Sequence, residues 1–302
     1  LVTGNSPGND MRFYWERVEA SRNFANKVWN ASRFILMNMD GVDTNQVALA
    51  DLEDADRWIL SKANRLTGEV TENMDKFELG IAMQKIYDFI WEEFCDWYIE
   101  MVKPRFREGG SPKSKEAACW TLKTVLITAL KLLHPYMPFI TEEIFCNIQD
   151  EEETIMLSAW PEPRKDWDFP ETEAQVELVK EAVRAMRNLR TSMNVAPSRK
   201  AQVYVVSEKE TVRQTFEGSK SFFAALGSAS EVKIQAERTG IPENAVSAVT
   251  ADAVLYLPLE DLVDVAKERE RLEKEEKRLT GELARVNGML SNEKFLSKAP
   301  EA

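Results

Sequence analysis

The sequence predicts a mainly α-helical protein, in which an antiparallel helix bundle is followed by a small α/β unit and a C-terminal coiled-coil helix. Three observations support this fold class. Long amphipathic stretches come first, short β-branched segments follow, and a heptad pattern of leucine and valine comes last. The predicted parts are a linker (1–10), the bundle (11–150), the α/β unit (151–260) and the coiled-coil helix (261–302).

Four long helices are expected in the bundle, at about 16–39, 52–72, 76–102 and 113–133. Asp40-Gly41 ends the first helix, and Pro104 follows the third. Because the connections are short, neighbouring helices should run antiparallel. After the fourth helix the sequence HPYMP breaks the pattern, and Thr141 is expected to cap a further short helix.

The α/β unit is predicted from a change of composition after Asp150. TIMLSAWPEP (154–163) reads as an extended piece closed by prolines, and a helix is expected over 172–193. Short β-branched segments bounded by turn residues then predict four strands, at 201–207, 231–237, 245–250 and 253–259.

A heptad pattern begins at Leu262. Apolar residues recur on alternating three- and four-residue steps, with Arg269 and Glu276 as polar exceptions. The apolar positions are Leu262, Val265, Leu272, Leu279, Leu283, Val286 and Leu290. The alternative interpretation is a charged helix that is simply exposed to solvent. A heptad strand buries its apolar side only against a partner helix, so we expect this helix to be frayed, packed on another copy, or held by crystal contacts.

Composition indicates a soluble globular protein of two or three domains, with 302 residues, 44% hydrophobic residues and a net charge of −12. No apolar run is long enough to cross a membrane. Cys95, Cys119 and Cys146 form no CxxC pair, and His134 is the single histidine. We therefore expect no disulfide framework, no metal site, few candidates for catalysis, and a reducing cytoplasm.

The stretch RNFANKVWNASRF (22–34) suggests an RNA-binding helix. One helical face holds its apolar residues, and another presents amides, guanidiniums and an indole, which suit phosphates and unpaired bases. The first face comprises Ala20, Phe24, Val28, Ala31, Ile35 and Met39; the second comprises Arg22, Asn26, Trp29 and Arg33, with Asn30 beside them. The alternatives are that Trp29 and Phe34 pack in the core, that the arginines pair with carboxylates, and that the asparagines bond neighbouring helices.

Residues 22–34 resemble the helix that opens the anticodon-binding domain of valyl-tRNA synthetases, which are class I enzymes with a class Ia helical bundle. LVTGNSPGND (1–10) resembles the segment shortly after the KMSKS loop of that family, and LLHPYMPFITEEIF (132–145) resembles a hallmark of the valine, isoleucine and leucine enzymes. AVRAMRNLRTSMNVAPSRK (182–200) resembles the helix and loop after the bundle. The heptad strand and NEKFLSKAP (292–300) resemble the first half of the carboxy-terminal coiled-coil arm.

This resemblance implies a role for each candidate site residue. Phe34 is the preferred stacking residue for an unpaired base. Asn26, Asn30 and Arg33 are candidates for base or phosphate contacts, and Arg17, Arg22 and Lys27 are candidate phosphate contacts. The coiled-coil arm is expected to lie along the outer corner of the tRNA. Arg187-Asn188-Leu189-Arg190 could touch RNA or simply end a polar helix, and the acidic cluster Asp51, Glu53, Asp54 and Asp56 is expected to be a solvated helix start.

The resemblance also implies a partner, tRNA(Val), and a parent enzyme that attaches valine to it. The HIGH and KMSKS signatures, which handle ATP, do not occur in this sequence, nor does an editing domain. We therefore expect residues 1–10 to lead from a catalytic domain that lies elsewhere in the polypeptide. This part of the protein should have no catalytic residue, metal or cofactor of its own, and should not aminoacylate tRNA alone. The parent enzyme is expected to be monomeric.

Two alternatives stay open at this point. The equivalent region of isoleucyl-tRNA synthetase is the nearer one, although that family usually ends in a cysteine-rich zinc module rather than a heptad arm. The other is a noncatalytic helical scaffold whose coiled coil mediates protein dimerisation. Binding to tRNA that weakens steeply with salt would favour a synthetase, and a concentration-dependent dimer without RNA affinity would favour a scaffold.

Overall fold

The computed structural model describes residues 13–107, 111–149, 151–263 and 265–291. The predicted linker, residues 1–10, and the segment 292–300 lie outside these residues. The chain divides into two compact units, Leu1–Lys180 and Glu181–Ala302. Helix α7 (Pro170–Ser192) contributes its first part to unit 1 and its second part to unit 2.

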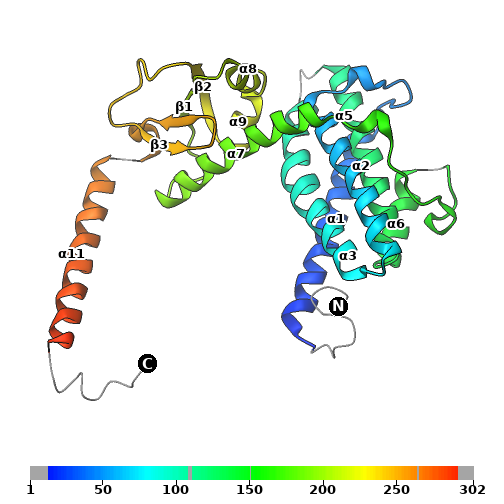
Figure 1. The fold of residues 1–302 in the computed structure, drawn as a ribbon, viewed down its shortest axis with the longest axis horizontal. Coiled ribbons are helices and arrows are strands. Elements are labelled where there is room, and N and C mark those ends of the chain that lie inside the picture. The colour runs from blue at the N-terminus through cyan, green and yellow to red at the C-terminus, as the bar shows by residue number, and fades with distance from the viewer. Residues whose placement is uncertain (1–12, 108–110, 150, 264, 292–302) are drawn as a thin grey trace. The chain divides into compact units, whose positions relative to one another are not determined.

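Unit 1 is an antiparallel helical bundle (Figure 1). Its long helices are α1 (Trp15–Met39), α2 (Asp54–Asp75) and α5 (Pro112–Leu133), and the shorter α6 (Pro138–Ile148) follows α5. Between α2 and α5 the chain forms one nearly continuous helical run, made of α3 (Leu79–Asp88), the π-helix η2 (Phe89–Tyr98), α4 (Ile99–Val102) and the 3-10 turn η3 (Lys103–Phe106). The remaining elements of unit 1 are the 3-10 turns η1 (Leu49–Asp51), η4 (Ile155–Leu157) and η5 (Lys165–Trp167).

Large aromatic side chains fill the centre of the bundle. Trp58, Phe94 and Tyr98 are completely buried, as is Phe145 of α6. Burial of one such side chain stabilises the fold by roughly 2–3 kcal/mol. The predicted helices of the bundle are therefore present, and the mainly α fold class is confirmed.

The structure corrects two local predictions. Helix α6 begins at Pro138, because proline tolerates the first helical turn, where its missing N–H costs nothing. Thr141 is buried within that first turn, and its hydroxyl donates to the Met137 carbonyl, so it is no cap. Residues 154–163 are not extended throughout, since the Thr154 hydroxyl accepts from the Met156 N–H and closes the turn η4.

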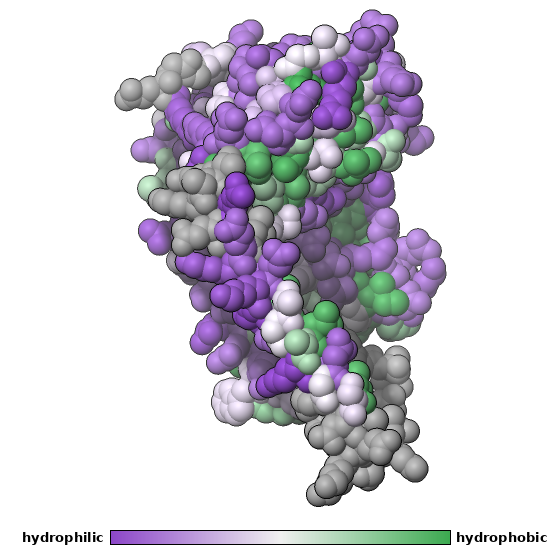
Figure 2. Space-filling model, turned by 90° about the vertical axis from the view of Figure 1, so that its left-hand side faces the viewer, coloured by the Kyte–Doolittle hydropathy of each residue, from purple (hydrophilic) through white to green (hydrophobic). Residues whose placement is uncertain are grey.

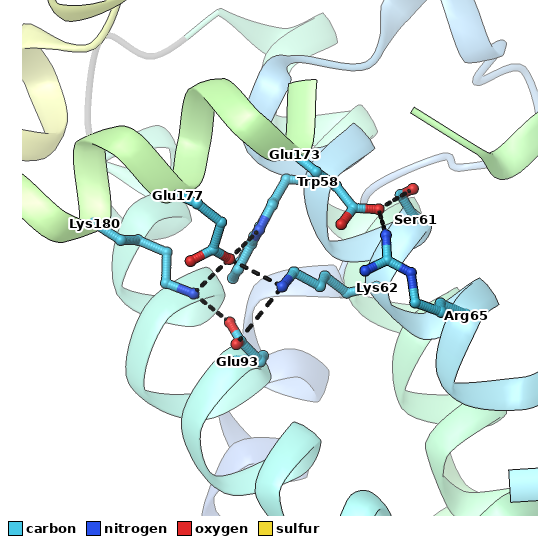
Figure 3. A network of polar contacts seen from close by, with 8 residues as sticks. All are labelled: Trp58, Ser61, Lys62, Arg65, Glu93, Glu173, Glu177 and Lys180. Carbon is cyan, nitrogen blue, oxygen red and sulfur yellow. Dashed lines mark hydrogen bonds and ion pairs between the residues drawn. The ribbon is translucent and has the colours of Figure 1, made fainter. Parts of the chain in front are cut away.

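A buried charge network fastens the first part of α7 to the bundle (Figure 3). The ammonium of Lys180, which is 0% exposed, lies 2.5 Å from Glu93 of η2 and 3.0 Å from Glu177. It also lies 4.5 Å from the ring centre of Trp58, whose indole N–H donates to Glu177. Lys62 completes the network at 3.0 Å from Glu177. Burial opposes ionisation of Glu177, but the two ammoniums outweigh it and lower the pKa of that carboxyl.

Unit 2 contains a four-stranded sheet in the order β2-β1-β4-β3. The strands are β1 (Ala201–Val206), β2 (Ala229–Gln235), β3 (Val246–Val249) and β4 (Val254–Leu257). Strands β1 and β2 are parallel and are joined through α8 (Glu210–Gly218) and α9 (Lys220–Leu226), whereas β4 is antiparallel to both β1 and β3. This is the predicted small α/β unit.

Alternate residues of the strands form the core of unit 2. Val203, Val205 and Leu255 are completely buried, and so is Phe223 of α9. Gly227 follows α9 where space is tight, because a Cβ there would lie 2.9 Å from both the Met186 side chain and the Phe223 carbonyl oxygen. A glycine is therefore required where α9 turns into β2.

Helix α11 (Val265–Leu290) follows the short helix α10 (Leu259–Leu262), as the heptad pattern predicts. Its described apolar residues stay uncovered: Leu279, Leu283, Val286 and Leu290 are between 45% and 62% exposed. The flanking charges pair along the helix, since Arg278 lies 2.6 Å from Glu275 and 2.7 Å from Glu282. Figure 2 shows a mainly hydrophilic surface in which hydrophobic side chains gather in separate patches. Across the described residues, none of the helices combines the length and apolar character that a membrane span needs.

Candidate nucleic-acid interface

The outward face of α1 carries most of the predicted site residues. Phe24, Val28, Ala31 and Ile35 turn into the bundle and are buried, which fixes the rotation of the helix. The opposite side is therefore open to solvent. Arg17, Arg22, Asn26, Asn30 and Arg33 are all exposed there. Trp29 is 41% exposed, which rules out the alternative that it packs in the core.

Two arginines of this face keep their charge available. Across the residues that the structure describes, neither Arg22 nor Arg33 has a carboxylate within ion-pair distance, and Arg22 donates only a long hydrogen bond, of 3.4 Å, to Asn23. Unpaired guanidiniums on an exposed helix face can bind phosphate bidentately. The alternative that these arginines pair with carboxylates is therefore not supported.

Lys27 differs from the predicted arginines, because it is half-buried and already paired. Its ammonium lies 2.6 Å from Asp96 of η2 and 3.8 Å from the ring centre of Trp91. A phosphate at this position would have to replace Asp96 as the anion beside Lys27.

Phe34 lies at the edge of the same face and is half-buried. Its ring meets Phe106 of η3 edge to face, with the ring centres 5.8 Å apart and the planes at 84°. The ammonium of Lys103 lies 5.8 Å from the centre of the Phe34 ring. Phe34 is thus not a core residue, but Phe106 of η3 covers part of its ring.

The π-helix and η3 form a second wall next to α1 that the sequence analysis missed. Tyr87 of α3 stacks on Trp91 with ring centres 5.6 Å apart, and Phe24 of α1 lies 4.6 Å from Tyr87. Phe106 of η3 is a further aromatic residue next to α1, beside Phe34. The many aromatic residues in YDFIWEEFCDWY (87–98) could have indicated this wall. Aromatic residues at helical spacing, however, are more often part of a hydrophobic core.

Two other candidate groups have structural partners. Arg190 is buried and donates to the carbonyl groups of Ala196 and Arg199, while Arg187 donates to the Leu226 carbonyl at 2.8 Å. Within the acidic cluster, Asp56 is completely buried and paired with Arg105. Among the described residues, no group of histidine, cysteine, aspartate and glutamate is arranged to hold a metal ion.

Comparison with protein-family models gives two matches. Residues 56–205 match the model described as the anticodon-binding domain of tRNA ligase. Residues 264–302 match the model described as the valyl tRNA synthetase tRNA binding arm. The first match includes most of the bundle, and the second covers the region of α11.

Curated relatives are similar along the whole chain. The valine–tRNA ligase of Clostridium tetani is 52% identical over 303 residues, and that of Clostridium acetobutylicum is 50% identical over 305 residues. The enzyme of Bacillus cereus strain ATCC 14579 is 41% identical over 304 residues. Each alignment covers 100% of this chain but only 34% of the relative, so the chain spans about a third of the length of these relatives.

A solved structure gives a weaker likeness. The crystal structure of a ternary complex of LeuRS, tRNA and LeuAMS from Agrobacterium radiobacter K84 superimposes with a TM-score of 0.42 at 14% identity. The match covers 68% of this chain and 21% of that one.

Proposed function

Because the chain belongs to the valyl-tRNA synthetase family, we propose that its bundle binds the anticodon loop of tRNA(Val) through the outward face of α1. One observation supports this assignment most: the amide and guanidinium side chains of α1 are exposed, with Phe34 beside them. Proteins that read RNA sequence generally bind unpaired bases that are splayed out, stacked on aromatic rings and hydrogen-bonded at their edges.

The face of α1 offers a group for each part of a nucleotide. Phe34 provides the ring for stacking. The amides of Asn26 and Asn30 can donate to and accept from base edges. Arg33 and Arg22 supply charge for phosphates, with Arg17 nearer the start of the helix. A base stacked on one aromatic ring contributes roughly 1–3 kcal/mol to binding.

Helix α11 is the second RNA contact in this proposal. It belongs to the region that matches the tRNA binding arm, and its 26 residues extend about 39 Å at a rise of roughly 1.5 Å per residue. That length suits a contact with the body of the tRNA at a distance from the loop. The uncovered apolar residues of α11 would then form the side that a second helix of the arm covers.

The full-length protein is proposed to be a valine–tRNA ligase that uses ATP to attach valine to tRNA. The catalytic and ATP-binding residues would lie in the part of the polypeptide outside this chain, because the HIGH and KMSKS signatures are absent from its sequence. We further propose a cytoplasmic, monomeric parent enzyme. The names of the relatives favour this function over an isoleucyl enzyme and over a noncatalytic scaffold.

A binding experiment tests the proposal. Affinity for tRNA(Val) and for the same tRNA with a replaced anticodon would be measured at several salt concentrations, for the wild type and for Phe34→Ala. The wild type should prefer the intact anticodon, and Phe34→Ala should lose about fivefold or more of its affinity for that tRNA while changing little for the other. A wild-type protein without any anticodon preference would refute the function. Equal losses on both tRNAs would instead make Phe34 a packing residue.

A further inference from the structure

A buried carboxylate at the start of α2 accepts hydrogen bonds from several segments of the bundle. Asp56 is 0% exposed and accepts from the Glu53 N–H at 2.9 Å and from the Tyr98 hydroxyl at 2.7 Å. Arg105 donates to both of its oxygens, at 2.9 and 3.0 Å. Three donors from three segments of the chain therefore converge on one carboxylate.

Arg105 connects this carboxylate to two further elements. It belongs to η3, its side chain is only 10% exposed, and its Nε donates to the Ser114 carbonyl at 3.1 Å. One guanidinium thus ties η3 to the first turn of α2 and to the first turn of α5. Each of its three nitrogens donates to a protein acceptor, so Arg105 has little to offer a phosphate.

The turn that Arg105 holds is the one that reaches the candidate RNA surface. Of the four residues of η3, Phe106 contacts the Phe34 ring and Lys103 lies beside it, paired with Glu100. A 3-10 turn of this length has no long packed face of its own. The turn continues from the buried helix α4, and Arg105 adds the polar contacts that tie it to α2 and α5.

We propose that Phe106 forms the second side of the base-binding surface whose first side is Phe34, and that Asp56 and Arg105 are the positioning residues that hold it there. The inference rests on the function proposed above and assigns it a further contact. Its ligand is an unpaired nucleotide of the anticodon loop, which stacks on Phe34 and is confined laterally by the Phe106 ring. Lys103 adds positive charge at the same edge.

The test uses an anticodon stem-loop of tRNA(Val) in which 2-aminopurine replaces an adenine of the loop, because stacking quenches its fluorescence. Phe106→Ala removes the second side directly. Arg105→Lys keeps the positive charge but cannot bridge Asp56 and Ser114 with a planar fork. Lys180→Met is the matched control, because it disturbs another buried charge network of unit 1 that does not reach Phe34. Thermal unfolding followed by circular dichroism reports on the stability of each variant.

We expect Phe106→Ala and Arg105→Lys each to weaken binding of the cognate stem-loop about tenfold, to reduce quenching, and to lower the preference over a replaced anticodon by a similar factor. Lys180→Met should be destabilised yet keep the wild-type preference. The inference would be overturned if Phe106→Ala showed the same quenching and the same anticodon preference as the wild type. It would also be overturned if Lys180→Met lost as much anticodon preference as the Phe106 and Arg105 variants. If Arg105→Lys is poorly folded, Phe106→Ala, a change at a half-buried side chain, still decides the matter.

Failure of this inference and failure of the proposed function give different results. If the wild type binds the cognate stem-loop with preference and the Phe106 variant does the same, only the second side is wrong. If the wild type has no preference at all, the function fails and the inference fails with it.

Discussion

Removing the ammonium of Lys180 should destabilise unit 1 by about 3 kcal/mol, at the low end of the range for one partner taken from a buried ion pair. Lys180 is itself 0% exposed, and it neutralises Glu93 and Glu177 from 2.5 and 3.0 Å. Those carboxylates are 23% and 37% exposed, so they keep some contact with water. Lys62 also remains, 3.0 Å from Glu177 and 4.0 Å from Glu93, which is why the low end applies.

The experiment compares Lys180→Met with the double variant Lys180→Met, Glu177→Gln. Methionine keeps the apolar stem between Trp58 and Trp97, and glutamine keeps an acceptor for the Trp58 indole N–H while removing the charge. The double variant should therefore recover at least half of the lost stability. Urea unfolding is followed by tryptophan fluorescence, to which Trp58 and Trp97 at this site contribute among the eight tryptophans of the chain. A loss below about 1 kcal/mol in the single variant, or no recovery in the double variant, would refute the electrostatic account.

Three further predictions follow from side chains already described. The pKa of Glu177 is lowered from its usual 4.5, so the contribution of its charge to stability is complete above about pH 4.5 and is lost as the pH falls further. In the wild type the urea midpoint should therefore fall between pH 5 and pH 3, and Glu177→Gln should make this fall less steep. An unchanged slope in the variant would contradict the prediction. Burial raises the pKa of Cys95 to about 12, and the pKa values of Cys119 and Cys146 are raised too, so exposure decides the order in which the thiols react: a disulfide reagent at pH 8 should modify the exposed Cys146 before the buried Cys95 and Cys119, and modification of Cys95 before unfolding, detected by mass spectrometry, would count against the packing. Arg190→Met leaves the Ala196 and Arg199 carbonyls without their donor and should cost unit 2 about 1–3 kcal/mol in thermal or urea unfolding, whereas the exposed Arg33→Met should cost less than about 0.5 kcal/mol.

The sequence alone predicted α1 to within one residue and placed its two faces correctly, because a regular α-helix repeats every 3.6 residues and the apolar spacing reveals its rotation. The prediction of buried residues was less reliable near the start of the helix. Ala20 was assigned to the buried face, yet it is exposed, since the first turns of α1 have less of the bundle beside them. The four strands were also predicted within two residues or so, from β-branched segments and turns.

The second wall of the candidate interface was not predictable by the same method. Along the π-helix and into α4, buried residues recur five apart, as at Phe89, Phe94 and Ile99, as well as four apart, so a wheel drawn at 3.6 residues per turn does not by itself assign the faces of this segment. Phe106 meets Phe34 from 72 residues away in the sequence, and the neighbouring Arg105 binds Asp56 from 49 residues away. Contacts of that kind follow from the packed bundle and leave no local pattern.

The π-helix also makes the length of its own segment matter. An i→i+5 helix holds about one residue more in each turn than an α-helix, so deleting a single residue between Phe89 and Tyr98 would force part of the segment into i→i+4 hydrogen bonding. The buried side chains of that part would then meet different neighbours although their identities were untouched. Among natural variants of this protein, amino-acid exchanges in the segment should thus be far more common than one-residue gaps or insertions.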